Sequence, residues 1–128
     1  MIPKYNLSGQ LGQPDYSIEQ ASPKDVYILW ILELNQELGL YSMMLTRSYM
    51  AGEENQEAHF RMISIARELW VQLFPKIQNT PLAKDFKKWL PFIVDPRLFL
   101  VDKYEGLLWL FEAHIRMALE HLNITKLA

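Results

Sequence analysis

Apolar residues recur at helical spacing along most of this chain, and this periodicity constrains the fold more than any other feature. Because an α-helix has 3.6 residues per turn, side chains three and four positions apart share one face. Within 22–52 the apolar positions follow steps of four, three, four, three and four residues, at Tyr27, Ile31, Leu34, Leu38, Tyr41 and Leu45. No stretch alternates with a period of two for long, and the Gly-rich turns of hairpins are missing. We therefore expect an all-α protein.

Helix start and stop signals divide this pattern into segments. The first helix should have Ser22 as its cap and Pro23 in its first position, and it should end before Gly52. The second should begin near 53–55 and end before Pro75. Its inward face should consist of Met62, Ala66, Leu69 and Leu73, flanked by Ile63 and Trp70.

Two further proline signals follow. A third, shorter helix should have Thr80 as its cap and end at Pro91. The last helix should begin at Pro96, or restart after Asp102, and run to about position 123. Its inward row should be Val101, Tyr104, Leu108, Phe111, Ile115, Ala118 and Leu122. Four helices with short connections predict a four-helix bundle with antiparallel neighbours.

The length and composition fit one folded domain. The chain has 128 residues, of which 50% are hydrophobic, so it has enough apolar surface for a core. Residues 1–21 contain two prolines and two glycines among scattered apolar residues, and we expect an irregular N-terminal arm there. Residues 22–128 should form a single helical domain.

Charge and residue usage exclude several classes of function. Thirteen basic and fifteen acidic residues give a net charge of −2, so nucleic-acid binding is not expected. The chain has no cysteine, which excludes disulfides, thiolate metal sites and cysteine nucleophiles. The N-terminal residues lack the apolar core of a signal peptide, and the longest apolar run, 26–32, is too short to span a membrane. A cytoplasmic protein is expected.

Two nearly identical hexapeptides contain two of the three histidines. They are EAHFRM at 57–62 and EAHIRM at 112–117. At about 100° per residue each forms one amphipathic turn. The Glu and Arg should point outward as an i,i+4 pair, Ala and Met should face the core, and His should turn inward. The repeat therefore indicates two copies of one packing solution more than two halves of a site.

The histidines also define a possible metal site. Carboxylates and histidines inside a helical bundle can bind two irons, but that site needs Glu-x-x-His, which puts both ligands on one face. Both hexapeptides have Glu-x-His, so this motif fails, even with Glu37 nearby. A site built from His59, His114 and His121 remains an alternative. We favour a structural role for these histidines and expect no metal or cofactor.

A second constellation lies near the end of the last helix. Arg116 and His121 have the spacing Arg-x4-His on a helix of a small all-α domain, which resembles the HEPN ribonuclease family. The resemblance covers six residues and implies that Arg116 and His121 act together on an RNA phosphate, usually across a homodimer. Met117 departs from the family, where the residue after the Arg is commonly polar. The phosphate-binding loops and nucleophile elbows of other enzyme families are absent.

Two stretches are apolar almost all the way round their helices. In 26–32, Leu29 and Leu32 lie away from the inward row and adjoin Trp30, and in 107–111, Trp109 shares a side with charged residues. These helices carry more apolar surface than one buried face requires, and either the N-terminal arm or a second subunit could bury the remainder. We therefore expect an interface at Leu29, Trp30, Leu32 and Trp109, most simply in a homodimer. A non-enzymatic regulator, adaptor or inhibitor that acts through protein contact is the favoured function.

Overall fold

Every regular element in the described part of the protein is a helix. The computed structural model describes residues 23–100 and 106–124. Three long α-helices are α3 (Pro23–Met50), α4 (Gln56–Leu73) and α7 (Gly106–His121), and two short ones are α5 (Leu82–Lys87) and α6 (Leu90–Val94). Two 3₁₀ helices are η1 (Phe74–Lys76) and η2 (Pro96–Leu100). The all-α class is confirmed, whereas the expected N-terminal arm and the Ser22 cap lie outside the described residues.

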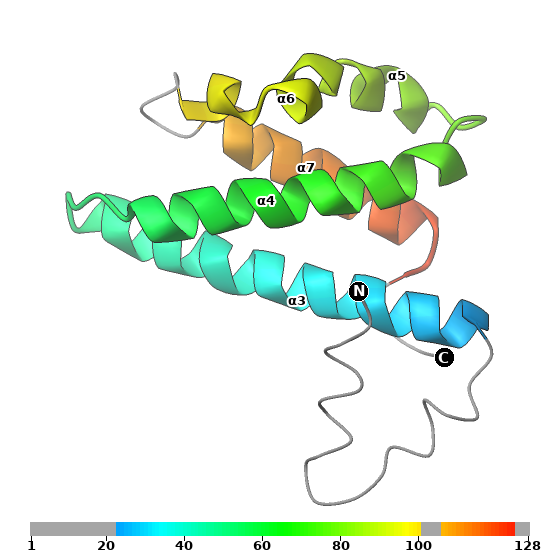
Figure 1. Cartoon of the computed structure of the whole chain (residues 1–128), viewed down its shortest axis with the longest axis horizontal. Helices are drawn as coiled ribbons and strands as arrows, with labels where there is room; N and C mark the ends of the chain where they lie inside the picture. Colours follow the sequence, from blue (N-terminus) through cyan, green and yellow to red (C-terminus); the bar gives the residue numbers. More distant parts are fainter. Residues whose placement is uncertain (1–22, 101–105, 125–128) are drawn as a thin grey trace, which may run out of the picture.

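The long helix α4 packs against both α3 and α7. Figure 1 shows α3 and α4 running antiparallel, with α7 behind α4 and pointing in the same direction as α4. The short helices α5 and α6 return the chain across α7 on the side away from α3. Because α4 contacts both other long helices, it is the helix on which the core depends most.

The inward faces of the long helices match the periodicity of the sequence. Ile31, Leu38 and Leu45 on α3 are buried, as are Leu108, Phe111 and Ile115 on α7. The central helix α4 buries the largest share, namely Ala58, Met62, Ile63, Ile65, Ala66, Leu69, Trp70 and Leu73. These predicted faces are confirmed, except that Val101 and Tyr104 lie outside the described residues. Within the described ranges no helix is long and apolar enough to cross a membrane.

Local signals set the turn between α3 and α4. Gly52 has a φ of +71°, a left-handed conformation that glycine adopts without strain, and it follows the end of α3. Asn55 caps α4, because its Oδ1 accepts a hydrogen bond of 3.0 Å from the backbone N–H of Ala58. Its Nδ2 donates to Ser48 Oγ at 3.3 Å and ties the cap to α3. The sequence signals for both helix ends are therefore confirmed.

The expected third helix forms as the short α5, and a second short helix, α6, spans Pro91, where the third helix was expected to end. Pro91 lies in the first turn of α6 and does not end the preceding helix. A proline is tolerated in the first turn of a helix, because the backbone N–H that it lacks has no helical partner there, and α5 already ends at Lys87. The last helix restarts at Gly106 after η2, which agrees with the second of its two expected starts. The arrangement as a four-helix bundle is not confirmed.

Tyr27 joins the beginning of α3 to the end of α4, and its titration should be visible in the stability. Its hydroxyl donates to the Gln72 carbonyl at 3.3 Å, and Lys76 Nζ lies 4.8 Å from its ring centroid. Burial raises the pKa of Tyr27 above its ordinary value of 10.0, because the protein interior disfavours the charged phenolate.

We expect Tyr27→Phe to flatten the alkaline end of the stability profile. Since the folded pKa is raised, the stabilisation by Tyr27 is fully present below pH 10 and is lost as pH rises through the folded pKa. Urea unfolding at about pH 8 and about pH 11 should show a smaller loss in Tyr27→Phe than in the natural chain. Tyr49→Phe, at an exposed tyrosine, is the matched control. Equal losses in both variants would contradict this account.

Candidate functional site

The two hexapeptides are buried in opposite ways. In the first copy Ala58 and Met62 are fully buried. In the second copy the equivalent residues, Ala113 and Met117, are exposed, and Ile115 is buried between them. The interpretation as two copies of one packing solution is therefore wrong. Each copy takes its orientation from the neighbours of its own helix, and only the half-buried state of the histidine is common to both.

His114 belongs to an aromatic cluster between α7 and the break after α5. The indole Nε1–H of Trp89 donates to His114 Nδ1 at 2.8 Å. Because an indole N–H can only donate, Nδ1 must accept, and the proton of the neutral ring is assigned to Nε2. Trp89 also packs against three phenylalanine rings, with centroid distances of 4.9 Å to Phe111, 5.2 Å to Phe92 and 6.0 Å to Phe99. This contact gives His114 a structural role.

Arg116 lies in a polar network between α7 and α3. Its Nε and Nη2 donate to Glu112 Oε2 at 3.1 and 2.7 Å, and its Nη1 donates to Asn35 Oδ1 at 3.1 Å. Ser42 Oγ donates to the other Glu112 oxygen at 3.1 Å. The expected i,i+4 pair is present, but it faces α3 and does not point into solvent. His121 is exposed at the end of α7. Arg116, its partner in the nuclease hypothesis, is hydrogen-bonded to Glu112 and Asn35 instead.

Gly39 lies beside this network, and a small side chain fits there. A Cβ atom at Gly39 would lie 3.6 Å from Arg116 Nη2, which is ordinary van der Waals contact. Glycine in the middle of a helix is less stable than alanine by about 0.5–1 kcal/mol. We expect Gly39→Ala to raise the free energy of unfolding by about this amount in urea titrations. A loss of stability would show that the guanidinium needs the space above Gly39.

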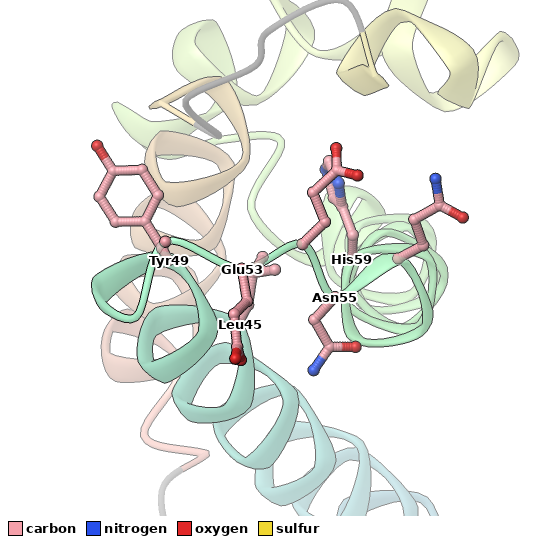
Figure 2. A pocket seen from close by; sticks show the side chains of 8 residues that line it. Leu45, Tyr49, Glu53, Asn55 and His59 are labelled. Carbon is pink, nitrogen blue, oxygen red and sulfur yellow. The ribbon is translucent and has the colours of Figure 1, made fainter.

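A hollow of about 280 Å³ lies at the turn between α3 and α4. Figure 2 shows Leu45 and Tyr49 coming from α3 on one side and His59 from α4 on the other. The His59 ring stacks beside Phe60 with centroids 6.4 Å apart, and its Nε2 is buried. The remaining lining consists of Gly52, Glu53, Glu54, Asn55 and Gln56.

This hollow does not assemble a metal site. Over residues 23–100 and 106–124, no group of three or more His, Asp or Glu side chains could hold a metal ion. His59 lies at the α3–α4 turn, His114 in the Trp89 cluster and His121 on the surface at the end of α7. The three histidines of the metal alternative are thus distributed over three environments.

The four expected interface residues are all half-buried. Trp30, Leu32 and Trp109 pack against the core. Trp30 also makes an edge contact with Tyr27, with ring centroids 6.1 Å apart. Trp109 lies on the same side of α7 as Glu112 and Arg116, which contact α3. Part of the apolar surface that the sequence left without a partner is therefore buried within the fold. The interface hypothesis at these residues stays a prediction.

The most exposed large apolar side chains of α3 lie in its second half. Leu40 and Met43 are each 54% exposed, and Met50 is 80% exposed. With their neighbours they form a band along α3, on the side opposite Ile31, Leu38 and Leu45 at about 100° per residue. We call this band the outer stripe: Leu29, Glu33, Gln36, Leu40, Met43, Met44, Arg47 and Met50.

Sequence reasoning identified only one end of the outer stripe. The sequence pattern places Leu29 away from the inward row, and Leu40, Met43 and Met44 point the same way further along the helix. The signal was available, because following the direction of Leu29 in steps of three and four leads to Gln36, Leu40 and Met43.

A second group of exposed apolar residues on α6 and η2 adjoins the undescribed residues 101–105; its members are Leu90, Val94, Leu98 and Leu100.

Comparison of the chain with models of known protein families, with curated proteins and with solved structures finds no match.

Proposed function

We propose that this chain is a non-enzymatic helical module that acts through protein–protein contact, as a regulator, an adaptor or an inhibitor. The observation that supports it most is the outer stripe of α3. Six of its residues are exposed: Gln36, Leu40, Met43, Met44, Arg47 and Met50. Contiguous exposed apolar residues rimmed by polar ones mark interaction surfaces in soluble proteins.

The composition of the outer stripe suits a contact surface. Leucine and methionine supply most of its apolar area, and the flexible methionine side chain adapts to partners of different shape. One glutamate, one glutamine and one arginine add polar groups that can fix the register of a partner. The inner face of α3 is already occupied by the core, so a partner on the outer stripe would not compete with folding.

The rival function is a metal-binding or HEPN-like ribonuclease bundle, and no specific observation favours it. Its sharpest form needs Arg116 and His121 to act on one phosphate, whereas the Arg116 guanidinium is hydrogen-bonded to Glu112 and Asn35. Loss of RNA cleavage in Arg116→Ala together with His121→Ala would support the nuclease. Absence of cleavage by the natural chain would remove it.

The architecture and location complete the proposal. We propose that α5 and α6 together replace the third helix of an antiparallel four-helix arrangement. They follow α4 and precede α7 in the chain, and they carry it back toward the end of the molecule where α7 begins (Figure 1). The absence of cysteine suits a reducing compartment, and we place the protein in the cytoplasm.

A photoreactive residue at Gln36 tests the proposed function directly. Gln36 is exposed in the middle of the outer stripe, so ultraviolet light should cross-link it to the bound partner in cells of the source organism. We expect an adduct, identified by mass spectrometry, that disappears in a Met43→Glu, Met44→Glu background. The same photoreactive residue at Val71, which is 48% exposed on α4, is the control. Adducts that are equal at both positions, or that survive in the double variant, would overturn the proposal.

A further inference from the structure

We propose that the outer stripe binds the outer stripe of a second copy of this chain, with the two α3 helices antiparallel around a two-fold axis at Leu40. This inference rests on the proposed function and names the partner for it. It follows from the order of residues along the stripe, from their exposure and from the positions of its two charges.

The stripe has the length and direction of a helix–helix contact. Glu33, Gln36, Leu40, Met44 and Arg47 follow one another at steps of three and four residues, and at about 100° per residue they all lie within about 40° of the direction of Leu40. From Leu29 to Met50 the stripe extends over about 30 Å of helix axis at about 1.5 Å per residue. Such a face can pack against one partner helix along its whole length.

The charges of the stripe are complementary to themselves in one orientation only. In an antiparallel pair with its axis at Leu40, positions equally distant from Leu40 face each other. Glu33, seven residues before Leu40, then faces Arg47, seven residues after it, and this contact occurs twice. A parallel pair would place Arg47 on Arg47 and Glu33 on Glu33. Opposite charges therefore select the antiparallel arrangement.

The remaining positions fit the same axis. Leu40 meets Leu40 of the second copy at the axis, and Met44 meets Gln36. At the ends, Met50 approaches Leu29, one of the residues that sequence reasoning assigned to an interface. Glu33 already has an interaction within the protein. A carboxylate offers several acceptor positions, so that interaction is compatible with a contact to Arg47 of the second copy.

Charge reversal at these two positions gives a sharp test. Glu33→Arg places two pairs of positive charges in the dimer, and Arg47→Glu places two pairs of negative charges there. Each variant alone should therefore dimerise at least roughly tenfold more weakly than the natural chain. An equimolar mixture of the two variants places opposite charges at both contacts. The mixture should therefore form a heterodimer with nearly natural affinity, measured by sedimentation velocity with one variant fluorescently labelled. The double variant should also recover the homodimer.

Controls separate this inference from the proposed function. Glu57→Arg, on the exposed side of α4, should leave dimerisation unchanged. Thermal unfolding followed by circular dichroism should show that the variants at these partly or fully exposed positions are folded. A dimer that is insensitive to both reversals, or a natural chain that is monomeric, overturns the self-association of α3. Neither result removes the proposed function if the Gln36 adduct contains a different protein.

Discussion

Trp89→Ala is expected to lower the free energy of unfolding by about 3–5 kcal/mol, as is typical for truncation of a buried tryptophan. Trp89 is 4% exposed and lies at the centre of the ring cluster that joins α6, η2 and α7. Its removal leaves a cavity among three phenylalanines and also removes the donor that binds His114 Nδ1 at 2.8 Å. Urea unfolding followed by far-ultraviolet circular dichroism measures the loss.

Two further variants separate packing from hydrogen bonding at this position. Trp89→Phe keeps an aromatic ring but loses the donor, so we expect a smaller loss of about 1–3 kcal/mol. Leu90→Ala changes the neighbouring residue, which is exposed on α6, and should alter stability by no more than about 0.5 kcal/mol. A Trp89→Ala loss as small as that of Leu90→Ala would mean that the aromatic cluster does not hold α6 to α7.

The second large effect is expected at Leu69 in the central helix. Leu69 is fully buried in α4, which packs against both α3 and α7. We expect Leu69→Ala to lower the free energy of unfolding by about 2–5 kcal/mol, because truncation removes buried methyl groups and leaves a cavity. The loss should appear equally when unfolding is followed by circular dichroism or by tryptophan fluorescence, since one core joins all three long helices.

Val71→Ala provides the matched control on the same helix. Val71 lies two residues further along α4 and is half exposed, so its truncation should change stability by about 0.5 kcal/mol or less. If Leu69→Ala were equally mild, α4 could not be the central helix of the core. Separate transitions for the two probes would show that α3 and α7 do not share one core.

The sequence predicted the helices and their inward faces because both depend on local spacing. The row from Ile31 to Leu45 on α3 and the row from Met62 to Leu73 on α4 are buried as expected. The Asn55 cap and the turn at Gly52 also follow from local chemistry. The prediction that Pro91 ends a helix is wrong, because a proline at the end of one helical pattern can equally stand in the first turn of the next helix.

Features that depend on neighbouring helices could not be predicted from periodicity. The hexapeptide at 112–117 has the same letters as the one at 57–62, yet α7 turns its Glu and Arg toward α3 and its Ala and Met toward solvent. Which side of a helix is covered is decided by what packs on it, and no spacing within α7 contains that information. Arg116 reaches α3 beside Gly39, and its Nη1 donates to Asn35 Oδ1 there.

The candidate site also depends on how the helices pack, and it lies on the outer stripe of α3 and not at the histidines. The histidines are chemically versatile and therefore candidate site residues in the sequence, but Trp89 donates a hydrogen bond to His114, and His59 and His121 lie in two other environments. The outer stripe consists of ordinary residues, and only their common exposure makes them notable. Its two charges, seven residues on either side of Leu40, connect the sequence of α3 to a specific symmetric partner.

Sedimentation equilibrium of the full natural chain beside Leu40→Glu tests the central claim most directly. Leu40 lies on the proposed axis, so the substitution places two carboxylates face to face in a contact that has lost its central leucines. From about 1 to about 100 µM, the natural chain should approach twice the chain mass of 15.1 kDa. Leu40→Glu should remain at the monomer mass, while Val71→Glu should behave like the natural chain. A natural chain that stays at 15.1 kDa throughout, or a Leu40→Glu variant that still dimerises, would contradict the account.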